Sequence, residues 1–78
     1  MRTIVSGACG RTGSLVTRAI AGSDELELVG AVEAPDCGAV GRLLRDVLPG
    51  CDSAAPVYAS LDSIEPDGYD VIVDFSTP

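Results

Sequence analysis

The sequence predicts an α/β fold, a parallel β-sheet that is truncated after its fourth strand, and three observations lead to this prediction. An apolar run, Arg2 to Ser6, is followed by a glycine-rich turn and a helical pattern from Arg11 to Ala21. Further apolar runs recur along the chain, with helical or irregular stretches between them. The last run, Tyr69 to Phe75, contains the strongest β pattern in the chain. Strands separated by such crossovers pair in parallel.

The first strand is expected at the centre of the sheet. Its residues Thr3, Ile4 and Val5 are β-branched and follow one another directly, so both faces of the strand suit burial under helices. Along the following helix two adjoining stripes are expected to make the apolar face, with Gly22 as the C-terminal cap. These stripes contain Leu15, Ala19, Gly22, Val16 and Ile20.

The remaining elements are shorter. Residues 41–48 form either a short helix or a loop across the sheet, and Ser60 is expected to cap one helical turn. The expected elements are strands at 26–33, 57–59 and 69–75, a helical turn at 61–64 and a turn at 65–68. The strands then lie in the spatial order third, second, first, fourth, the first half of a doubly wound, Rossmann-like sheet. Because no helix follows the fourth strand, we expect residues 1–78 to be one incomplete dinucleotide-binding domain.

Composition excludes several classes of function. The chain has 78 residues and a net charge of −7, which argues against nucleic acid or an anionic membrane as partner. No apolar stretch approaches the roughly 20 residues of a membrane helix, so the cytoplasm is the expected compartment. The three cysteines, Cys9, Cys37 and Cys51, form no C-x-x-C pair, and histidine is absent. We therefore expect free thiols and no metal site.

The glycine-rich turn is the candidate phosphate site. Gly7, Gly10 and Gly13 follow a strand and open a helix, although their spacing differs from the usual G-x-G-x-x-G. We expect Gly7 to allow the tight turn, Gly10 to let the backbone approach a pyrophosphate, and Gly13 to allow close helix–strand packing. Backbone N–H groups and the helix N-terminus attract anions at such a turn. The alternative is a glycine-rich turn with no ligand.

Two side chains within the turn have open interpretations. Cys9 is expected to be a small filler, although a thiol near a helix N-terminus can also have a lowered pKa. Arg11 either lies over the pyrophosphate, stacks on an adenine, or is an exposed arginine at the helix start.

Glu33 is the second candidate contact. It ends the second strand about 20 residues after the last glycine, where an acidic side chain accepts hydrogen bonds from the adenosine ribose. The alternative is a solvated acid at a strand end. Ala34 and Asp36 follow it, and neither suits the 2′-phosphate of NADP. NAD(H) is therefore the favoured cofactor, with NADP(H) as the alternative if Arg11 or the loop arginines, Arg42 and Arg45, swing in.

The end of the fourth strand should face the same cleft. Ser76 and Thr77 either bind the nicotinamide half of a dinucleotide or cap a following helix, and Asp74 is expected to be structural. No catalytic residue is expected, because the chain has neither histidine nor lysine.

Taken together, three segments resemble the 4-hydroxy-tetrahydrodipicolinate reductases (dihydrodipicolinate reductases) of the diaminopimelate–lysine pathway. The segments are 4–13 (IVSGACGRTG), 28–33 (LVGAVE) and 71–78 (VIVDFSTP), so the resemblance covers essentially the whole chain. The family usually reads G-A-x-G-R-M-G, A-x-E and I-D-F-[ST]-x-P there. Thr12 replaces the usual Met, and Ala34 stands where some members carry an arginine for the 2′-phosphate.

The resemblance implies an NAD(P)H-binding half of a cytoplasmic, homotetrameric reductase. Such an enzyme transfers hydride to a cyclic dicarboxylate, while a second domain supplies a His-His and Lys motif and the tetramer contacts. That motif does not occur in these residues, so this chain alone should not turn over. The residues expected to contact the cofactor are Gly7, Ala8, Cys9, Gly10, Arg11, Thr12, Gly13, Glu33, Phe75 and Ser76. Two alternatives remain: a non-catalytic nucleotide-binding module, or the Rossmann half of another small-molecule reductase.

Overall fold

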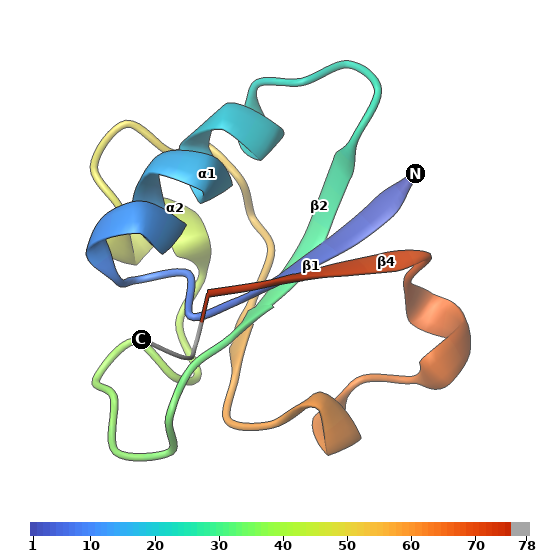
Figure 1. The fold of residues 1–78 in the computed structure, drawn as a ribbon. Helices are drawn as coiled ribbons and strands as arrows, with labels where there is room; N and C mark the ends of the chain where they lie inside the picture. The colour runs from blue at the N-terminus through green and yellow to red at the C-terminus, as the bar shows by residue number, and fades with distance from the viewer. Residues whose placement is uncertain (76–78) are drawn as a thin grey trace.

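A four-stranded parallel sheet in the order β3-β2-β1-β4 forms the framework of the chain (Figure 1). The computed structural model describes residues 1–75, so the expectations for Ser76 and Thr77 lie outside the described residues. The elements are β1 (Arg2–Ser6), α1 (Arg11–Ala21), β2 (Glu27–Val32), α2 (Leu44–Val47), β3 (Val57–Tyr58), the 3₁₀ turns η1 (Leu61–Ser63) and η2 (Pro66–Gly68), and β4 (Val71–Asp74). The predicted fold class and strand order are confirmed.

The core lies between the sheet and the two helices, which Figure 1 shows on the same side of the strands. Val5, Ala31 and Val57 occupy matching positions on β1, β2 and β3, and all three are buried. Ile20 of α1 and Leu44 of α2 belong to the same hydrophobic cluster. The sequence therefore closes one face of the sheet with side chains from both helices.

The orientation of α1 differs in part from the expectation: the stripe of Val16 and Ile20 packs against the hydrophobic cluster, whereas the stripe of Leu15 and Ala19 does not. Leu15 is 64% exposed, and Ala19 is exposed too, whereas the helix buries Gly13, Thr17 and Ile20. The close approach of Gly13 to the preceding turn fixes which face looks inward, and residues four and seven positions later share that face. The Thr17 hydroxyl is buried because it donates to the Gly13 carbonyl oxygen at 2.6 Å.

Between β2 and β3, the helix is shorter than the one considered for residues 41–48: it spans only Leu44–Val47. Only one turn, α2, is helical, because Gly41 has a φ of 86° and Leu43 is extended. Leu43 pairs with Pro56 in an antiparallel bridge instead of starting the helix. The predicted cap at Ser60 is confirmed, since its hydroxyl accepts from the Asp62 N–H at 3.0 Å.

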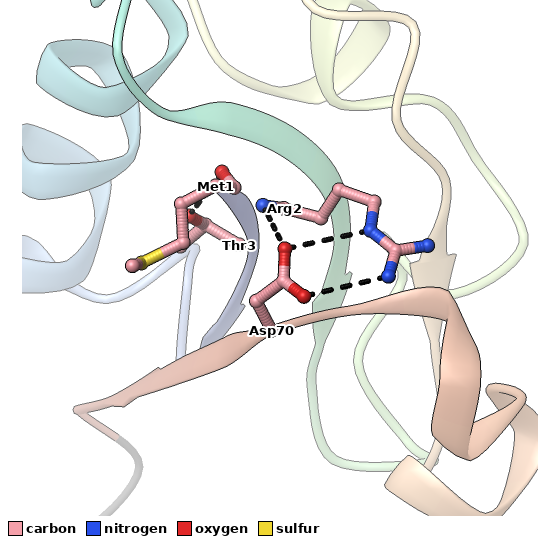
Figure 2. A network of polar contacts seen from close by, with 4 residues as sticks. All are labelled: Met1, Arg2, Thr3 and Asp70. Atoms are coloured by element: carbon pink, nitrogen blue, oxygen red, sulfur yellow. Dashed lines mark hydrogen bonds and ion pairs between the residues drawn. The ribbon is translucent and has the colours of Figure 1, made fainter.

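At the amino ends of the strands, Asp70 fastens β1 to the segment that enters β4 (Figure 2). Its carboxylate accepts the Arg2 backbone N–H at 2.8 Å and contacts the Arg2 guanidinium at 3.4 Å. The Arg2 carbonyl in turn accepts the Asp70 N–H at 2.8 Å. The amide and guanidinium of Arg2 hold the pKa of Asp70 below its ordinary value. This polar contact lies at the edge opposite to the glycine-rich turn.

Candidate functional site

The turn after β1 is tight because Gly7 adopts a φ of 78°. A side chain with a Cβ is strained in that left-handed region, so the conformational role predicted for Gly7 is confirmed. The Gly7 N–H donates to the Val32 carbonyl at 2.8 Å, and the Gly10 N–H donates to the Gly7 carbonyl at 3.2 Å. These bonds fix the turn against the end of β2.

The space available for a side chain differs between Gly13 and Gly10. A Cβ on Gly13 would lie 2.0 Å from the Gly7 carbonyl oxygen, so α1 reaches its place only without a side chain there. The predicted close packing at Gly13 is confirmed. A Cβ on Gly10 would meet that oxygen at 3.5 Å, an ordinary contact. The described part of the fold therefore does not itself require glycine at position 10.

The first turn of α1 offers unpaired donors. Gly10 is the N-cap, and no side chain accepts a hydrogen bond there. The first helical bond runs from the Ser14 N–H to the Gly10 carbonyl at 2.8 Å. Within residues 1–75, the N–H groups of Arg11, Thr12 and Gly13 have no acceptor. These groups give the helix end a partial positive charge that favours an anion.

Glu33 reaches this turn from the end of β2. Its Oε2 accepts the Cys9 N–H at 2.5 Å, and its own N–H donates to the Tyr58 carbonyl at 3.0 Å. The same carboxylate lies beside the Cys9 thiol and forms a side-chain hydrogen bond with it. An acidic side chain is therefore held at the turn by the backbone of Cys9.

The Cys9 thiol is not an activated nucleophile. Burial, the Glu33 carboxylate and the Cys37 thiol together raise its pKa from 9.0 to about 11. The alternative of a lowered pKa is therefore wrong, because desolvation and a neighbouring negative charge outweigh the helix N-terminus. The half-buried side chain instead packs against the hydrophobic cluster.

A pocket of about 450 Å³ joins the ends of the strands to the turn. It is lined by Ser6, Gly7, Gly10, Val32, Glu33, Ala34 and Phe75. Four of these residues, Gly7, Gly10, Glu33 and Phe75, belong to the predicted set. None of the lining side chains is basic, and Phe75 is fixed by its N–H, which donates to the Ser6 carbonyl at 2.7 Å.

The other predicted residues within 1–75 do not line this pocket, and Ser76 lies outside the described residues. Ala8 is fully buried in the core, while Arg11 and Thr12 are exposed at the start of α1. Three lining residues are not in the predicted set: Ser6, Val32 and Ala34. Ser6 and Val32 each end a strand, and Ala34 follows Glu33. In parallel sheets ligands bind outside the carboxyl ends of strands, so this position was the available signal.

A second pocket, of about 560 Å³, lies at the amino ends of β1 and β2. It contains none of the predicted residues, and its carboxylates repel a phosphate. Its lining residues are Met1, Ala21, Ser23, Asp24, Glu25, Leu26, Glu27, Leu28, Asp52 and Ser53. Within residues 1–75, no three His, Cys, Asp or Glu side chains are grouped to hold a metal ion. The described helices are also too short or too polar to cross a membrane.

Comparison with known proteins decides the family. The family described as "Dihydrodipicolinate reductase, N-terminus" matches residues 1–78. The chain belongs to this dihydrodipicolinate reductase family. The predicted resemblance is therefore confirmed.

Individual members of the dihydrodipicolinate reductase family match over nearly the whole chain. The 4-hydroxy-tetrahydrodipicolinate reductase of Bradyrhizobium sp. (strain ORS 278) is 43% identical over 81 residues, which cover 100% of this chain and 28% of the relative. The enzyme of the same name from Syntrophomonas wolfei is 38% identical, covering 99% of this chain and 28% of the relative. That from Methanothermobacter thermautotrophicus is 35% identical, covering 97% and 29%. The chain thus spans less than a third of the length of these relatives.

Proposed function

We propose that this chain binds a pyridine dinucleotide and forms part of the NAD(P)H-binding domain of a 4-hydroxy-tetrahydrodipicolinate reductase. One observation carries the proposal: the glycine-rich turn, the start of α1 and the Glu33 carboxylate converge at one pocket. Family membership supports it independently, because the matched relatives carry the reductase name. That name also disfavours a non-catalytic module.

In this proposal, different protein groups bind the pyrophosphate and the ribose of the dinucleotide. The unpaired N–H groups at the start of α1 suit the pyrophosphate, since they donate to anions without a basic side chain. Glu33 is held through Oε2, and its carboxylate can accept a further hydrogen bond from a ribose hydroxyl. Gly10 leaves room for a ligand at a position where the described fold tolerates a Cβ. Phe75 offers an apolar surface on the same pocket.

NADH is the preferred form in this proposal. A 2′-phosphate beside the ribose would meet the Glu33 carboxylate, while the lining of the pocket contributes no positive side chain. Two negative groups placed side by side repel each other. Arg11 directly follows Gly10 in the sequence, but its side chain is exposed and does not line the pocket.

The bound cofactor would supply the hydride, and the substrate would be the cyclic dicarboxylate in the relatives' name. The chain's own residues bind and orient the dinucleotide; with no histidine or lysine, they offer no general acid suited to neutral pH. Substrate binding, proton donation and the homotetramer therefore belong, in this proposal, to the longer protein. The three free thiols fit the cytoplasm as its compartment.

Calorimetric titration with NADH tests the ribose assignment. Replacing Glu33 with Ala should weaken NADH binding roughly tenfold to a hundredfold, because a hydrogen bond to a charged group is lost. Glu33→Gln is the matched control: its amide oxygen still accepts the Cys9 N–H and a ribose hydroxyl, so the loss should be smaller. An unchanged affinity in Glu33→Ala would sink the assignment.

The same pair of variants reports on the 2′-phosphate. Wild type should bind NADH at least as well as NADPH, and Glu33→Gln should shift the ratio toward NADPH by removing a negative charge. If a demonstrably folded chain binds neither nucleotide, the proposed function is wrong.

A further inference from the structure

The described part of the chain buries three polar side chains, those of Thr3, Ser6 and Thr17. The hydroxyls of Thr3 and Thr17 donate to the carbonyl oxygens of Met1 and Gly13, at 3.3 Å and 2.6 Å. The Ser6 hydroxyl forms no hydrogen bond with any residue in 1–75, although Ser6 is only 9% exposed. Burying a hydroxyl without a partner costs free energy, so buried hydroxyls are normally bonded. Ser6 therefore needs an explanation that the described fold does not supply.

The Ser6 side chain is directed into the pocket at the carboxyl ends of the strands. Ser6 ends β1 and lines that pocket. The preceding residue, Val5, is buried in the cluster under the helices, so the alternation along β1 turns Ser6 toward the opposite face of the sheet. Val32, its partner in the register of β1 and β2, lines the same pocket. Among the described residues, no side-chain oxygen is shut off from both solvent and a partner, so the Ser6 hydroxyl opens into the pocket.

The backbone groups around this hydroxyl are already occupied. The Ser6 carbonyl accepts the Phe75 N–H at 2.7 Å, and the Gly7 N–H donates to the Val32 carbonyl at 2.8 Å. The other lining residues within 1–75 are glycines and apolar side chains, apart from the Glu33 carboxylate, which accepts. The Ser6 hydroxyl is thus the side-chain donor that this lining offers to a ligand.

We propose that the Ser6 hydroxyl is a further cofactor contact and donates a hydrogen bond to the pyrophosphate of the dinucleotide. This inference rests on the proposed function, and it adds a side-chain donor to a site that otherwise meets the phosphates with backbone N–H groups. Phosphate oxygens accept hydrogen bonds, and the lining contributes no basic side chain to meet them. Ser6 directly precedes Gly7, where the turn toward α1 begins, and it lies one strand away from Glu33, which is assigned to the ribose.

The contact predicts opposite effects of the hydroxyl with and without the ligand. In the unliganded chain the hydroxyl is mostly removed from water and has no described partner, so Ser6→Ala should leave the urea midpoint unchanged or raise it. With NADH bound, Ser6→Ala loses a hydrogen bond to a charged group, and the affinity should fall roughly tenfold. A hydroxyl with a purely structural role would give the reverse pattern, a lower midpoint and an unchanged affinity.

The test combines urea unfolding with calorimetric titrations of NADH and ADP. Ser6→Ala should bind both ligands roughly tenfold more weakly than wild type, because both contain a diphosphate. Ser6→Thr keeps a hydroxyl at this position and should restore much of the affinity. Ser53→Ala is the matched control, since it removes a serine hydroxyl from the lining of the second pocket and should leave both affinities unchanged. The phosphorus NMR resonances of bound NADH should also differ between Ser6→Ala and wild type.

The outcomes separate this contact from the proposed function. Equal NADH affinity in wild type and Ser6→Ala would overturn the contact and leave the proposed function standing. A loss seen with NADH but not with ADP would overturn the assignment to the pyrophosphate, because it would move the hydroxyl to the nicotinamide half. An equal loss in Ser53→Ala would also overturn it, since the effect would then not be specific to Ser6. If the folded wild type binds neither ligand, the proposed function fails and the Ser6 contact fails with it.

Discussion

At the scale of single residues, the three glycines of the turn serve different purposes although the sequence presents them alike. Gly7 supplies a left-handed conformation, and Gly13 lets α1 approach the Gly7 carbonyl. Gly10 meets neither demand, since a Cβ there makes only an ordinary contact. The described fold does not require glycine at position 10, so the small size of Gly10 is best explained by a ligand that approaches the backbone there.

Alanine substitutions should separate these purposes. Gly13→Ala should cost more than about 3 kcal/mol in the free energy of unfolding, because its methyl group collides with backbone and cannot be accommodated by a rotamer change. Gly10→Ala should cost only about 1 kcal/mol or less, the range for an N-cap change, yet weaken NADH binding roughly tenfold by filling the pocket. Urea unfolding and calorimetry measure the two quantities. Equal NADH affinity in wild type and Gly10→Ala would remove the argument for a ligand at this position.

At the scale of elements, α1 is oriented by its contact with the turn, not by its most apolar stripe. Leu15 is exposed, whereas Thr17 is buried with its hydroxyl bonded to the Gly13 carbonyl. Ile20, one turn further, is 6% exposed and joins the hydrophobic cluster. The helix therefore places a polar residue inside so that its first turn can meet the glycine-rich turn.

Alanine substitutions at Ile20 and Leu15 test this orientation of α1. Ile20→Ala should lower the free energy of unfolding by about 2–5 kcal/mol, since it leaves a cavity beneath α1. Leu15→Ala should change it by no more than about 0.5 kcal/mol, as for other surface substitutions. Chemical denaturation of both variants gives the comparison. A larger loss for Leu15→Ala than for Ile20→Ala would contradict this orientation of α1.

The contrast between α1 and α2 shows what the sequence can predict. The bounds of β1 and α1 follow from local patterns, a β-branched run and a glycine-to-glycine helix, so both were predicted correctly. The face of α1 depends on a steric contact with Gly7, which periodicity does not contain. The shortening of α2 depends on Leu43 pairing with Pro56, a partner distant in sequence. In the same way, Glu33 was predicted at the site, but its bond to Cys9 was not.

At the scale of the whole molecule, the two ends of the parallel strands carry different features. The carboxyl ends of β1, β2 and β4 meet at the glycine-rich turn and its pocket. The amino ends carry the Arg2–Asp70 contact and the acidic second pocket. Parallel strands make this separation unavoidable, because every strand delivers its last residue to the same side. A dinucleotide should therefore affect one edge and leave the other unchanged.

Amide chemical shifts recorded during an NADH titration test this directly. The largest changes should occur at Arg11, Thr12 and Gly13, whose N–H groups are unpaired at the start of α1, and at Glu33, while Asp70 at the amino ends of the strands stays unchanged. A matching titration of Glu33→Ala should reduce the changes without moving them to another part of the sheet. Shifts concentrated at Asp70 and the amino ends of the strands, or spread evenly over the chain, would contradict a dinucleotide site at the glycine-rich turn.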